Sequence, residues 1–323
     1  MNLPGRLKNR EKIACWQRST ARNLFLALAL ALLYAPPALA WNEAGHRIVA
    51  ALAWRELRPE AKAQITALLR RHPAYAGLWK PALATASSER AGQTLFLQAA
   101  VWPDTVRTPG NPYNHAPWRY IAHPYVPDAF RSRFAPADDV RADSLTEQIT
   151  LRQDTLRSPD MPQREQAISL CWLVFLAAEA HQPLSCATLF SPAFPHSDRN
   201  GQDFWVRTAA GPASLHAFWD SLPGAASGSA AIQREAGRIS AAYPHSLLAE
   251  TASKEPEAWG WESAALAATV YRQGRLRGSS LPQNAHALPP NYAKAAHSLA
   301  DRRLALAAYR LADILNLLFA STK

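Results

Sequence analysis

Cysteine is scarce in this chain of 323 residues, which contains only Cys15, Cys171 and Cys186. This scarcity excludes a zinc site built from several thiolates, so any metal centre must use histidines, carboxylates or the chain terminus. Cys171 falls within a predicted helix and Cys186 lies beyond its end. Pairing of the two in an exported chain is left open, because a disulfide needs Cα atoms within about 7 Å of each other.

Long apolar runs are also missing, and the run at 24–34 is too short to span a bilayer comfortably. It follows six basic residues and precedes two prolines and Ala38-Leu39-Ala40, a pattern that signal peptidase cuts. We therefore predict a signal peptide over residues 1–40 and a secreted or periplasmic mature protein that begins at Trp41 and has no membrane contact. An uncleaved membrane anchor is the alternative.

Charge of one sign is less dominant than the net value of +10 suggests. The leader holds six basic residues and one acidic residue, which is half of the net charge. The remaining 283 residues carry only a mild basic excess, which favours an anionic partner weakly. They are numerous enough to form one domain with a substantial core.

No convincing alternation of apolar and polar residues predicts strands, and no internal repeat is present. Helical spacing of apolar residues recurs instead, so we predict an all-α protein with a single helical domain over residues 41–323. Seven prolines within 103–140 indicate a surface loop, and the long irregular stretch 184–203 is a candidate functional loop. The predicted helices are 45–57, 59–71, 93–102, 141–157, 164–181, 214–222, 230–243, 256–273 and 292–319.

The segment that begins at Trp41 is a candidate metal site. A free α-amino group has a pKa near 8, so at neutral pH it loses its proton readily and can chelate a metal together with its own carbonyl oxygen. His46 supplies an imidazole that could bind the same ion. The ordinary alternative is that Trp41 is a hydrophobic anchor and His46 a surface residue.

Further candidates lie on predicted helices or at their ends. Asp104 precedes Arg107 by three residues, and Glu179 lies at the end of the most apolar helix. His216 and Asp220 are four residues apart, so they share a helix face and could bind one ion together. A solvated helix face is the alternative for such a pair, whereas a buried, unpaired glutamate is costly and therefore more suggestive.

Taken in order, eight short motifs resemble the S1/P1 nuclease family, which shares its helical fold with zinc-dependent phospholipase C. Each motif is unspecific alone, and their order along the whole mature chain carries the resemblance. The motifs are Trp41-x-x-x-Gly45-His46, Trp102-Pro103-Asp104-x-x-Arg107, Pro117-Trp118-Arg119-Tyr120, Ala178-Glu179-Ala180-His181-Gln182-Pro183-Leu184, Asp198-Arg199-Asn200-Gly201-Gln202-Asp203, Leu215-His216-x-x-Trp219-Asp220, Trp261-Glu262-Ser263 and Arg310-Leu311-Ala312-x-x-Leu315-Asn316.

The resemblance implies a helical domain whose cleft holds three zinc ions and cleaves phosphodiesters of single-stranded RNA and DNA, often with 3′-nucleotidase activity. Arg107 is then expected to steady the phosphate during catalysis, together with Asp104. Tyr120 is expected to stack on a base, and Arg119 to contact substrate. The metal ligands implied by the resemblance are Trp41, His46, Asp104, Glu179, His216 and Asp220.

Several positions depart from the family pattern. Arg119, Phe175 and Ser185 stand where the family has zinc-binding histidines, and Glu179 replaces a shared aspartate. A guanidinium has no acceptor and a phenyl ring has no suitable lone pair, so we expect fewer than three zinc ions. Arg119 is predicted to pair with Asp104 and to supply a fixed positive charge in place of an ion. Substitution by His123, four residues later, is the alternative.

Three functions remain compatible with these residues. The first is an exported, metal-dependent phosphodiesterase that cleaves single-stranded RNA or DNA endonucleolytically. The second is a catalytically degenerate relative that binds phosphate or nucleic acid without cleaving it. The third is a phospholipase C-like hydrolase, although the sequence shows no added lipid-binding stretch. The expected partner is single-stranded nucleic acid or nucleotides, and no stable protein partner is implied.

Overall fold

The computed structural model describes residues 41–320 except 85–86, 138–142 and 273. The predicted signal peptide and the first residues of the helix predicted at 141–157 lie outside the described residues. Among the helices of the described part, none is both long and apolar enough to cross a membrane.

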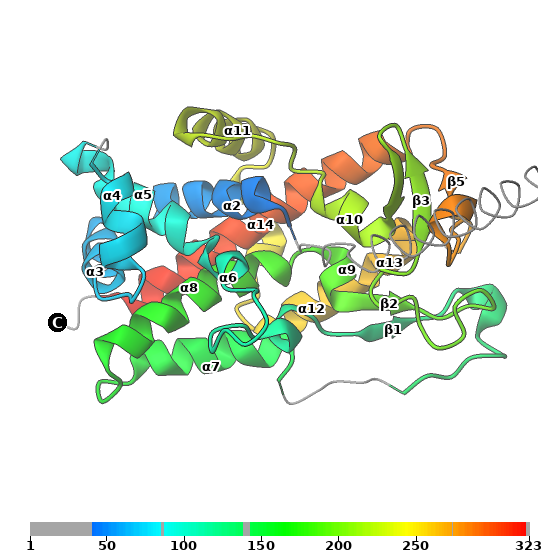
Figure 1. Ribbon diagram of the computed structural model, residues 1–323, viewed down its shortest axis with the longest axis horizontal. Coiled ribbons are helices and arrows are strands. Elements are labelled where there is room, and N and C mark those ends of the chain that lie inside the picture. Colours follow the sequence, from blue (N-terminus) through cyan, green and yellow to red (C-terminus); the bar gives the residue numbers. More distant parts are fainter. Residues whose placement is uncertain (1–40, 85–86, 138–142, 273, 321–323) are drawn as a thin grey trace, which may run out of the picture. The chain divides into compact units, whose positions relative to one another are not determined.

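The described chain is mostly helical, which confirms the predicted all-α class (Figure 1). The helices that start close to their predicted starts are those whose apolar residues recur at regular helical spacing. The helices are α2 (Glu43–Glu56), α3 (Pro59–Leu69), α4 (Lys80–Ala82), α5 (Ser88–Ala99), α6 (Trp102–Thr105), α7 (Leu145–Arg157), α8 (Gln163–Glu179), α9 (Pro183–Cys186), α10 (Leu215–Asp220), α11 (Ser229–Ala242), α12 (Pro256–Ala265), α13 (Ala267–Val270) and α14 (Tyr292–Leu318).

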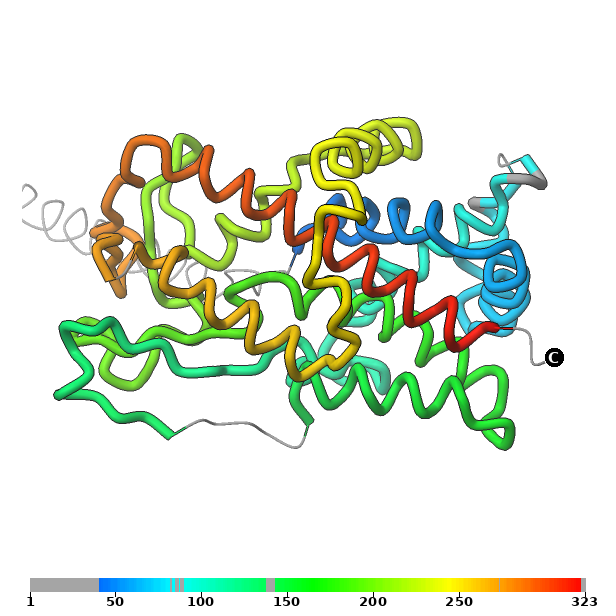
Figure 2. The backbone as a smooth tube through the Cα atoms, turned by 180° about the vertical axis from the view of Figure 1, so that it is seen from behind, coloured from blue at the N-terminus to red at the C-terminus, as the bar shows by residue number. Residues whose placement is uncertain are grey.

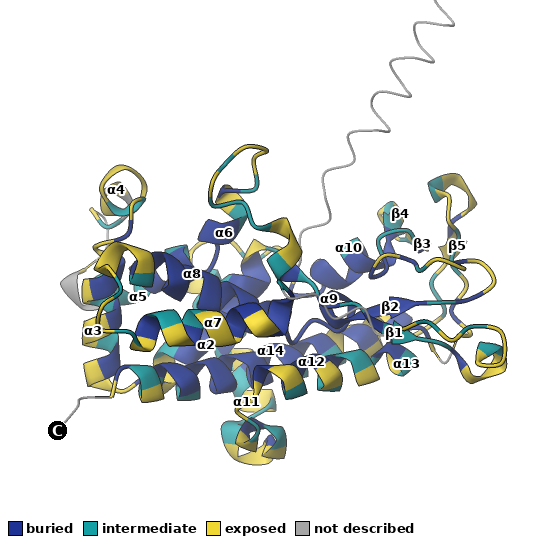
Figure 3. Cartoon of the chain, turned by 90° about the horizontal axis from the view of Figure 1, so that it is seen from below, coloured by how far each residue is buried: buried dark blue, intermediate teal, exposed yellow. Residues whose placement is uncertain are grey.

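Helix α8 is the centre of the packing. It is buried continuously from Ala167 to Glu179, as its dark ribbon in Figure 3 shows. Helices α7, α14, α2, α3 and α5 all pack against it, and α11 covers α2 from the outside (Figures 1 and 2). A helix that is apolar all round belongs in a core, so the most apolar segment of the sequence takes the position that its composition dictates.

Local signals set where several helices begin. Asn42 caps α2 by accepting a hydrogen bond from the backbone N–H of Gly45 at 3.0 Å, and Glu43 complements the helix dipole. Pro59 opens α3 at a position where its missing N–H costs nothing. Pro183 opens α9, directly after the turn that follows α8. These signals set the start of α2 and the start of α9 just after α8, close to the candidate site residues.

Short strands were not predicted, because segments of two to four residues are too short to show an alternating pattern. They form two small sheets, a parallel pair and a three-stranded sheet in the order β4-β3-β5. The strands are β1 (His123–Tyr125), β2 (Ala187–Leu189), β3 (Trp205–Thr208), β4 (Gly211–Ser214) and β5 (His286–Ala287).

The loop after β2 is held by the buried carboxylate of Asp198. It accepts hydrogen bonds from the Leu189 backbone N–H at 2.9 Å and from the Tyr271 hydroxyl at 2.5 Å. Burial raises the pKa of Asp198 to about 6. Asn200 and Gly201 follow in the left-handed region, with φ of 58° and 78°. This turn brings the 184–203 stretch back onto α10.

Other predictions need correction. The region 72–90, predicted as loop, contains α4 and the start of α5, whereas the helix predicted over 256–273 is broken between α12 and α13. Cys171 and Cys186, whose pairing the sequence left open, are both free and buried. Burial raises the pKa of both thiols, so they pack as small apolar side chains.

Candidate functional site

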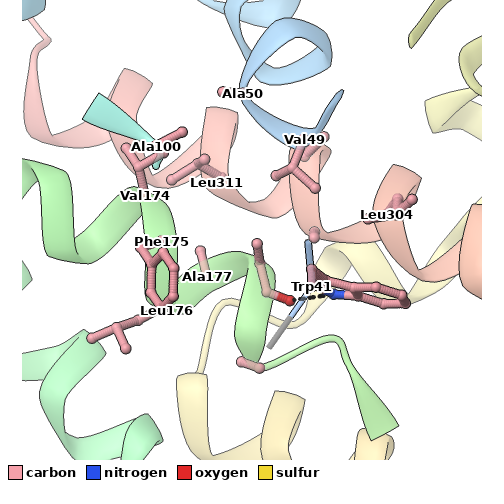
Figure 4. Packing of buried hydrophobic residues seen from close by; sticks show 14 of the residues in the cluster. Trp41, Val49, Ala50, Ala100, Val174, Phe175, Leu176, Ala177, Leu304 and Leu311 are labelled. Atoms are coloured by element: carbon pink, nitrogen blue, oxygen red, sulfur yellow. Dashed lines mark hydrogen bonds between the residues drawn. The ribbon is translucent and has the colours of Figure 1, made fainter. Parts of the chain in front are cut away.

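The segment that begins at Trp41 is anchored to two distant helices. Its indole is fully buried and donates from Nε1 to the carbonyl of Ala178 at 3.0 Å (Figure 4). The backbone N–H of Asn42 donates to the carbonyl of Asp220 at 3.1 Å. A Cβ at Gly45 would lie 3.0 Å from the Cβ of Trp41, so glycine permits this close approach. The start of α2 therefore meets the end of α8 and the end of α10.

His46 and Glu179 meet across this junction. His46 Nε2 lies 3.0 Å from Glu179 Oε1, and both side chains are buried. The pair lacks hydrogen-bond geometry, so these two atoms are left without a hydrogen-bond partner. The His46 ring also stacks on Phe175, with ring centroids 4.1 Å apart and planes 12° apart. The ring of Phe175 thus covers one face of the imidazole.

Arg119, at the end of a short 3-10 helix (Ala116–Arg119), lies against Phe175. Its guanidinium carbon is 4.6 Å from the Phe175 ring centroid and 5.4 Å from the ring centroid of Trp172. Nη1 donates to Asp104 Oδ1 at 2.8 Å, and Nη2 donates to the carbonyl of Pro103 at 2.6 Å. The predicted pairing of Arg119 with Asp104 is present in the structure.

A second arginine converges on the same carboxylate oxygen. Arg107 Nε lies 3.2 Å from Asp104 Oδ1, one helical turn along the chain. The Arg119 side chain is 1% exposed, whereas those of Arg107 and Asp104 are 15% and 17% exposed. Burial and the nearby Arg107 lower the pKa of Arg119, but a guanidinium stays charged in proteins. Two cations therefore face one anion at the edge of solvent.

His216 and Asp220 lie on one face of α10, as their spacing predicted, and both are buried. His216 Nδ1 is 2.7 Å from the carbonyl of Asn200, which requires the proton on Nδ1 and leaves the Nε2 lone pair free. That Nε2 lies 3.6 Å from Asp220 Oδ2, and neither atom has a hydrogen-bond partner. Gln182 donates to the other Asp220 oxygen at 2.9 Å. Burial lowers the pKa of His216 to about 4 and raises the pKa of Asp220.

Tyr120 lies between these two groups. Its ring contacts the edge of His216, with centroids 5.7 Å apart. Burial raises the pKa of the Tyr120 hydroxyl to about 12. The ring lines a pocket of about 440 Å³ together with residues of the 196–203 turn, including Asn200 and Gln202. An aromatic at the wall of a polar pocket suits the predicted base-stacking role.

His181 belongs to a different group of side chains, although it is only two residues from Glu179. Its Nε2 is 3.1 Å from Arg310 Nη1, and its Nδ1 is 2.7 Å from the Ala177 carbonyl. Arg310 also binds both oxygens of Glu262, at 2.7 and 2.8 Å. The motifs around Glu262 and Arg310 therefore build a polar network that ties α8, α12 and α14 together.

The three zinc ions implied by the resemblance fit these residues only in part. At Asp104 the neighbouring group is the Arg119 guanidinium, which has no lone pair for a metal. Among the described residues, no group of three or more His, Cys, Asp or Glu side chains is arranged to hold a metal ion. By contrast, the facing atoms of His46 and Glu179, and those of His216 and Asp220, are buried and lack hydrogen-bond partners, which is compatible with a role as metal ligands.

The carbonyl of Asn200 and the amide of Gln182 orient His216 and Asp220 in the way that outer-shell groups orient metal ligands. No role was predicted for Gln182 or Asn200, because each meets its partner through the fold. His123, the predicted substitute ligand, instead stacks on Trp261 at 3.7 Å between ring centroids. No local sequence signal could have placed these contacts.

Comparison with known proteins points to one family. A model of the S1/P1 nuclease family matches residues 41–320, which is most of the chain. A search among curated proteins gave no significant match. The family comprises nucleases that depend on zinc, which identifies the protein's general class as nuclease-like hydrolase with a nucleic-acid substrate. The chain belongs to the S1/P1 nuclease family.

Proposed function

We propose that this protein binds single-stranded nucleic acid by the phosphate backbone and that Arg107 and Arg119 form the phosphate-binding site. The observation that carries this proposal is their convergence on Asp104 Oδ1, at 3.2 and 2.8 Å. Two guanidiniums share one carboxylate oxygen, and guanidinium donors match phosphate oxygens in geometry. The partial exposure of Arg107 places its donors where a phosphate can approach.

Base recognition in this proposal is nonspecific. Tyr120 follows Arg119 directly and lines the pocket of about 440 Å³. Stacking on an aromatic ring is tolerated by every base, so strands of different sequence would bind alike. Single strands are favoured over duplexes because their bases are free to stack.

Cleavage by a pair of zinc ions is not supported by the arrangement at Asp104. Arg119 supplies a permanent charge that compensates the carboxylate and attracts phosphate. It does not lower the pKa of a bound water, which is what a metal contributes to hydrolysis. We therefore place binding ahead of two-zinc cleavage as the main activity.

Metal-dependent hydrolysis is the second candidate, and it rests on a separate observation. His46 with Glu179, and His216 with Asp220, each present two facing atoms without hydrogen-bond partners. His46 and Glu179, with the amino group of Trp41 once it is freed, would hold one metal ion, and His216 with Asp220 would contribute to a second. A bound metal would supply Lewis-acid activation of water. Arg107 would then stabilise charge on the phosphate.

The amino group of Trp41 is free only if the leader is removed. We propose export through the signal peptide at residues 1–40 and cleavage before Trp41, on the strength of the leader's basic, apolar and small-residue segments. N-terminal sequencing of the exported protein tests this. A first residue other than Trp41 would remove the amino group from the proposed metal site.

One experiment separates binding from hydrolysis. Purified mature protein is mixed with a fluorescent single-stranded DNA, with zinc or with a chelator, and anisotropy and product formation are followed together with metal content. We expect binding that changes less than twofold on chelation, and no zinc-dependent product. Three zinc ions per chain with chelator-sensitive cleavage would overturn the proposal, and zinc-dependent cleavage with fewer ions would favour the second candidate.

Arg107→Ala should weaken this binding by about tenfold, because one charge-assisted phosphate contact is lost. Arg157→Ala is the matched control, since Arg157 also pairs with an aspartate three residues earlier, at 3.0 Å, but on an exposed part of α7. Equal effects of the two substitutions would show that the arginine at 107 has no special role.

A further inference from the structure

A groove between α3 and α5 lies outside the site described above. Its volume is about 670 Å³, and Trp54 of α2 lines it together with both helices. Alanines of both helices and Gly92 contribute small side chains to its wall. A Cβ at Gly92 would lie 2.5 Å from Thr66 Oγ1 and 3.1 Å from the Trp54 ring, so the groove is shaped by a position that tolerates only glycine without movement.

Positive charge is concentrated in this groove. The lysine Lys62 and the arginine Arg70 come from α3 and Arg90 comes from α5, and none of the lining residues whose side chains the structure describes is acidic. Arg70 and Arg90 are exposed, and none of the three cations forms an ion pair with another described side chain. Many arginines elsewhere on the surface pair with carboxylates, as Arg131 and Arg157 do. Three neighbouring unpaired cations attract a polyanion.

An aromatic ring accompanies the charge. Trp54 is partly exposed and packs its ring on Phe96, with centroids 5.4 Å apart. Lys62 Nζ lies 5.9 Å from the Trp54 ring centroid, at the limit of a cation–π contact. Cations along a groove with an aromatic side chain beside them are the combination that binds single-stranded nucleic acid without sequence preference.

Helix α5 connects this groove to the arginine pair. Arg90 lies in its first turn, and Asp104 follows its last residue by only five positions. A helix of twelve residues is about 18 Å long, so a strand of a few nucleotides could reach from one site to the other. Figure 1 shows α3 and α5 at one end of the described domain and α6 closer to its middle.

We propose that the groove lined by Lys62, Arg70, Arg90 and Trp54 is a second binding site for the phosphate backbone of single-stranded nucleic acid. This inference rests on the proposed function, which supplies the identity of the ligand. It extends the proposed contact from a single phosphate at the arginine pair to several phosphates along one strand. The site predicts that affinity increases with strand length beyond what the arginine pair alone can contact.

The test compares a dinucleotide with a 16-nucleotide single strand, using the mature protein and the charge-reversal variant Lys62→Glu/Arg70→Glu/Arg90→Glu. We expect the variant to bind the long strand at least tenfold more weakly and the dinucleotide within twofold of wild type. The slope of log K against log salt for the long strand should fall by about 2, at about 0.7 per lost phosphate contact.

The matched control is Arg133→Glu/Arg234→Glu/Lys294→Glu, which changes the net charge equally at three exposed positions outside the groove. An equal loss of long-strand affinity in this control would overturn the groove, because total charge would then explain the effect. The proposal would also be overturned if the groove variant lost affinity for the dinucleotide and for the long strand to the same extent. The neutral variant Lys62→Gln/Arg70→Gln/Arg90→Gln repeats the comparison if charge reversal prevents folding, as checked by circular dichroism.

Failure of the proposed function gives a different result. If the arginine pair binds no phosphate, Arg107→Ala leaves dinucleotide binding unchanged while the groove variant still weakens the long strand. Anionic lipid is tested with vesicles that contain phosphatidylserine. Loss of vesicle binding in the groove variant with unchanged long-strand affinity would overturn nucleic acid as the ligand.

Discussion

Two halves of the candidate site differ in how their buried charge is satisfied. In the arginine-filled half, Asp104 is bound by Arg107 and Arg119, and Phe175 packs against Arg119. In the open half, His216 and Asp220 face each other at 3.6 Å with two unpartnered atoms. In the first half, the Arg119 guanidinium supplies the positive charge. The second half keeps two side chains that can bind a metal, His216 and Asp220, and the hydrogen bonds that orient them.

The comparison teaches that ligand loss and ligand retention can coexist within one centre. A partly buried carboxylate is stabilised by a positive partner, and at Asp104 the chain supplies one as Arg119, at one of the lost histidine positions. Where the histidine is kept, as His216, its Nε2 and the facing Asp220 Oδ2 have no hydrogen-bond partner among the described residues. Glu179 and His46 lie between the halves, with Phe175 stacked on the imidazole.

The largest expected effect comes from restoring histidine at the lost ligand positions, which are 119 and 175 in the arginine-filled half and 185 beside His216 and Asp220. The variant Arg119→His/Phe175→His/Ser185→His should gain about one zinc ion per chain, because imidazole nitrogens replace groups that cannot bind metal. Metal content after dialysis against dilute zinc measures the gain. No increase over wild type would mean that these three positions do not surround a metal site.

Removing the Arg119 guanidinium should have the next largest effect. Arg119→Met should lower the free energy of unfolding by about 3 kcal/mol, because Asp104 loses its closest partner and two hydrogen bonds are broken. Urea unfolding of the mature protein measures this loss. Arg157→Met, at an exposed pair, should cost at most about 1 kcal/mol, and similar losses in both would remove the distinction between them.

Acid should lower the free energy of unfolding through His72, which stacks on Trp79 and meets the edge of Trp102 in α6. Burial, and then the charge of Arg164, lower its pKa to about 3. The unfolded chain binds this proton below about pH 6.5 and the folded chain does not, so stability falls as the pH drops from about 6.5 to about 3.

At pH 5 this loss amounts to about 2 kcal/mol relative to pH 7.5. His72 Nδ1 accepts a hydrogen bond from the Ala74 N–H at 3.0 Å, and an asparagine oxygen can take that place. Unfolding of His72→Asn should therefore depend less on pH by that amount, whereas the exposed His286→Asn should behave as wild type. A pH dependence unchanged by His72→Asn would contradict the assignment.

Tyr120, which contacts the open half, should give the smallest effect. Tyr120→Ala should weaken single-strand binding by about 1 kcal/mol, or roughly fivefold, by removing a stacking surface. Tyr120→Phe should bind nearly as wild type, because the ring and not the hydroxyl makes the contact. An equal loss in both variants, measured by anisotropy, would point to the hydroxyl instead.

The sequence was sufficient for the helices and for part of the site. Apolar spacing located α2, α8 and α14 closely, and the spacing of His216 and Asp220 placed them on one face of α10. The pairing of Arg119 with Asp104 also followed from their chemistry. Strands of two to four residues carry too little pattern to be predicted.

The remaining features depend on contacts between distant parts of the chain. Phe175 meets His46 across 129 positions, and Gln182 meets Asp220 across 38. Neither contact leaves a local pattern, because each is created by packing α8 against α2 and α10. The separation of His181 from Glu179 into different networks has the same origin.

The anchoring of Trp41 has a consequence for the order in which the protein folds. Its indole binds the carbonyl of Ala178, and the neighbouring Asn42 binds the carbonyls of Asp220 and Gly224, 137 to 182 residues along the chain. Contacts of such long sequence separation form slowly, because a large loop must close first. The junction between α2, α8 and α10 is therefore expected to close only after synthesis has passed Gly224, as a late step in folding.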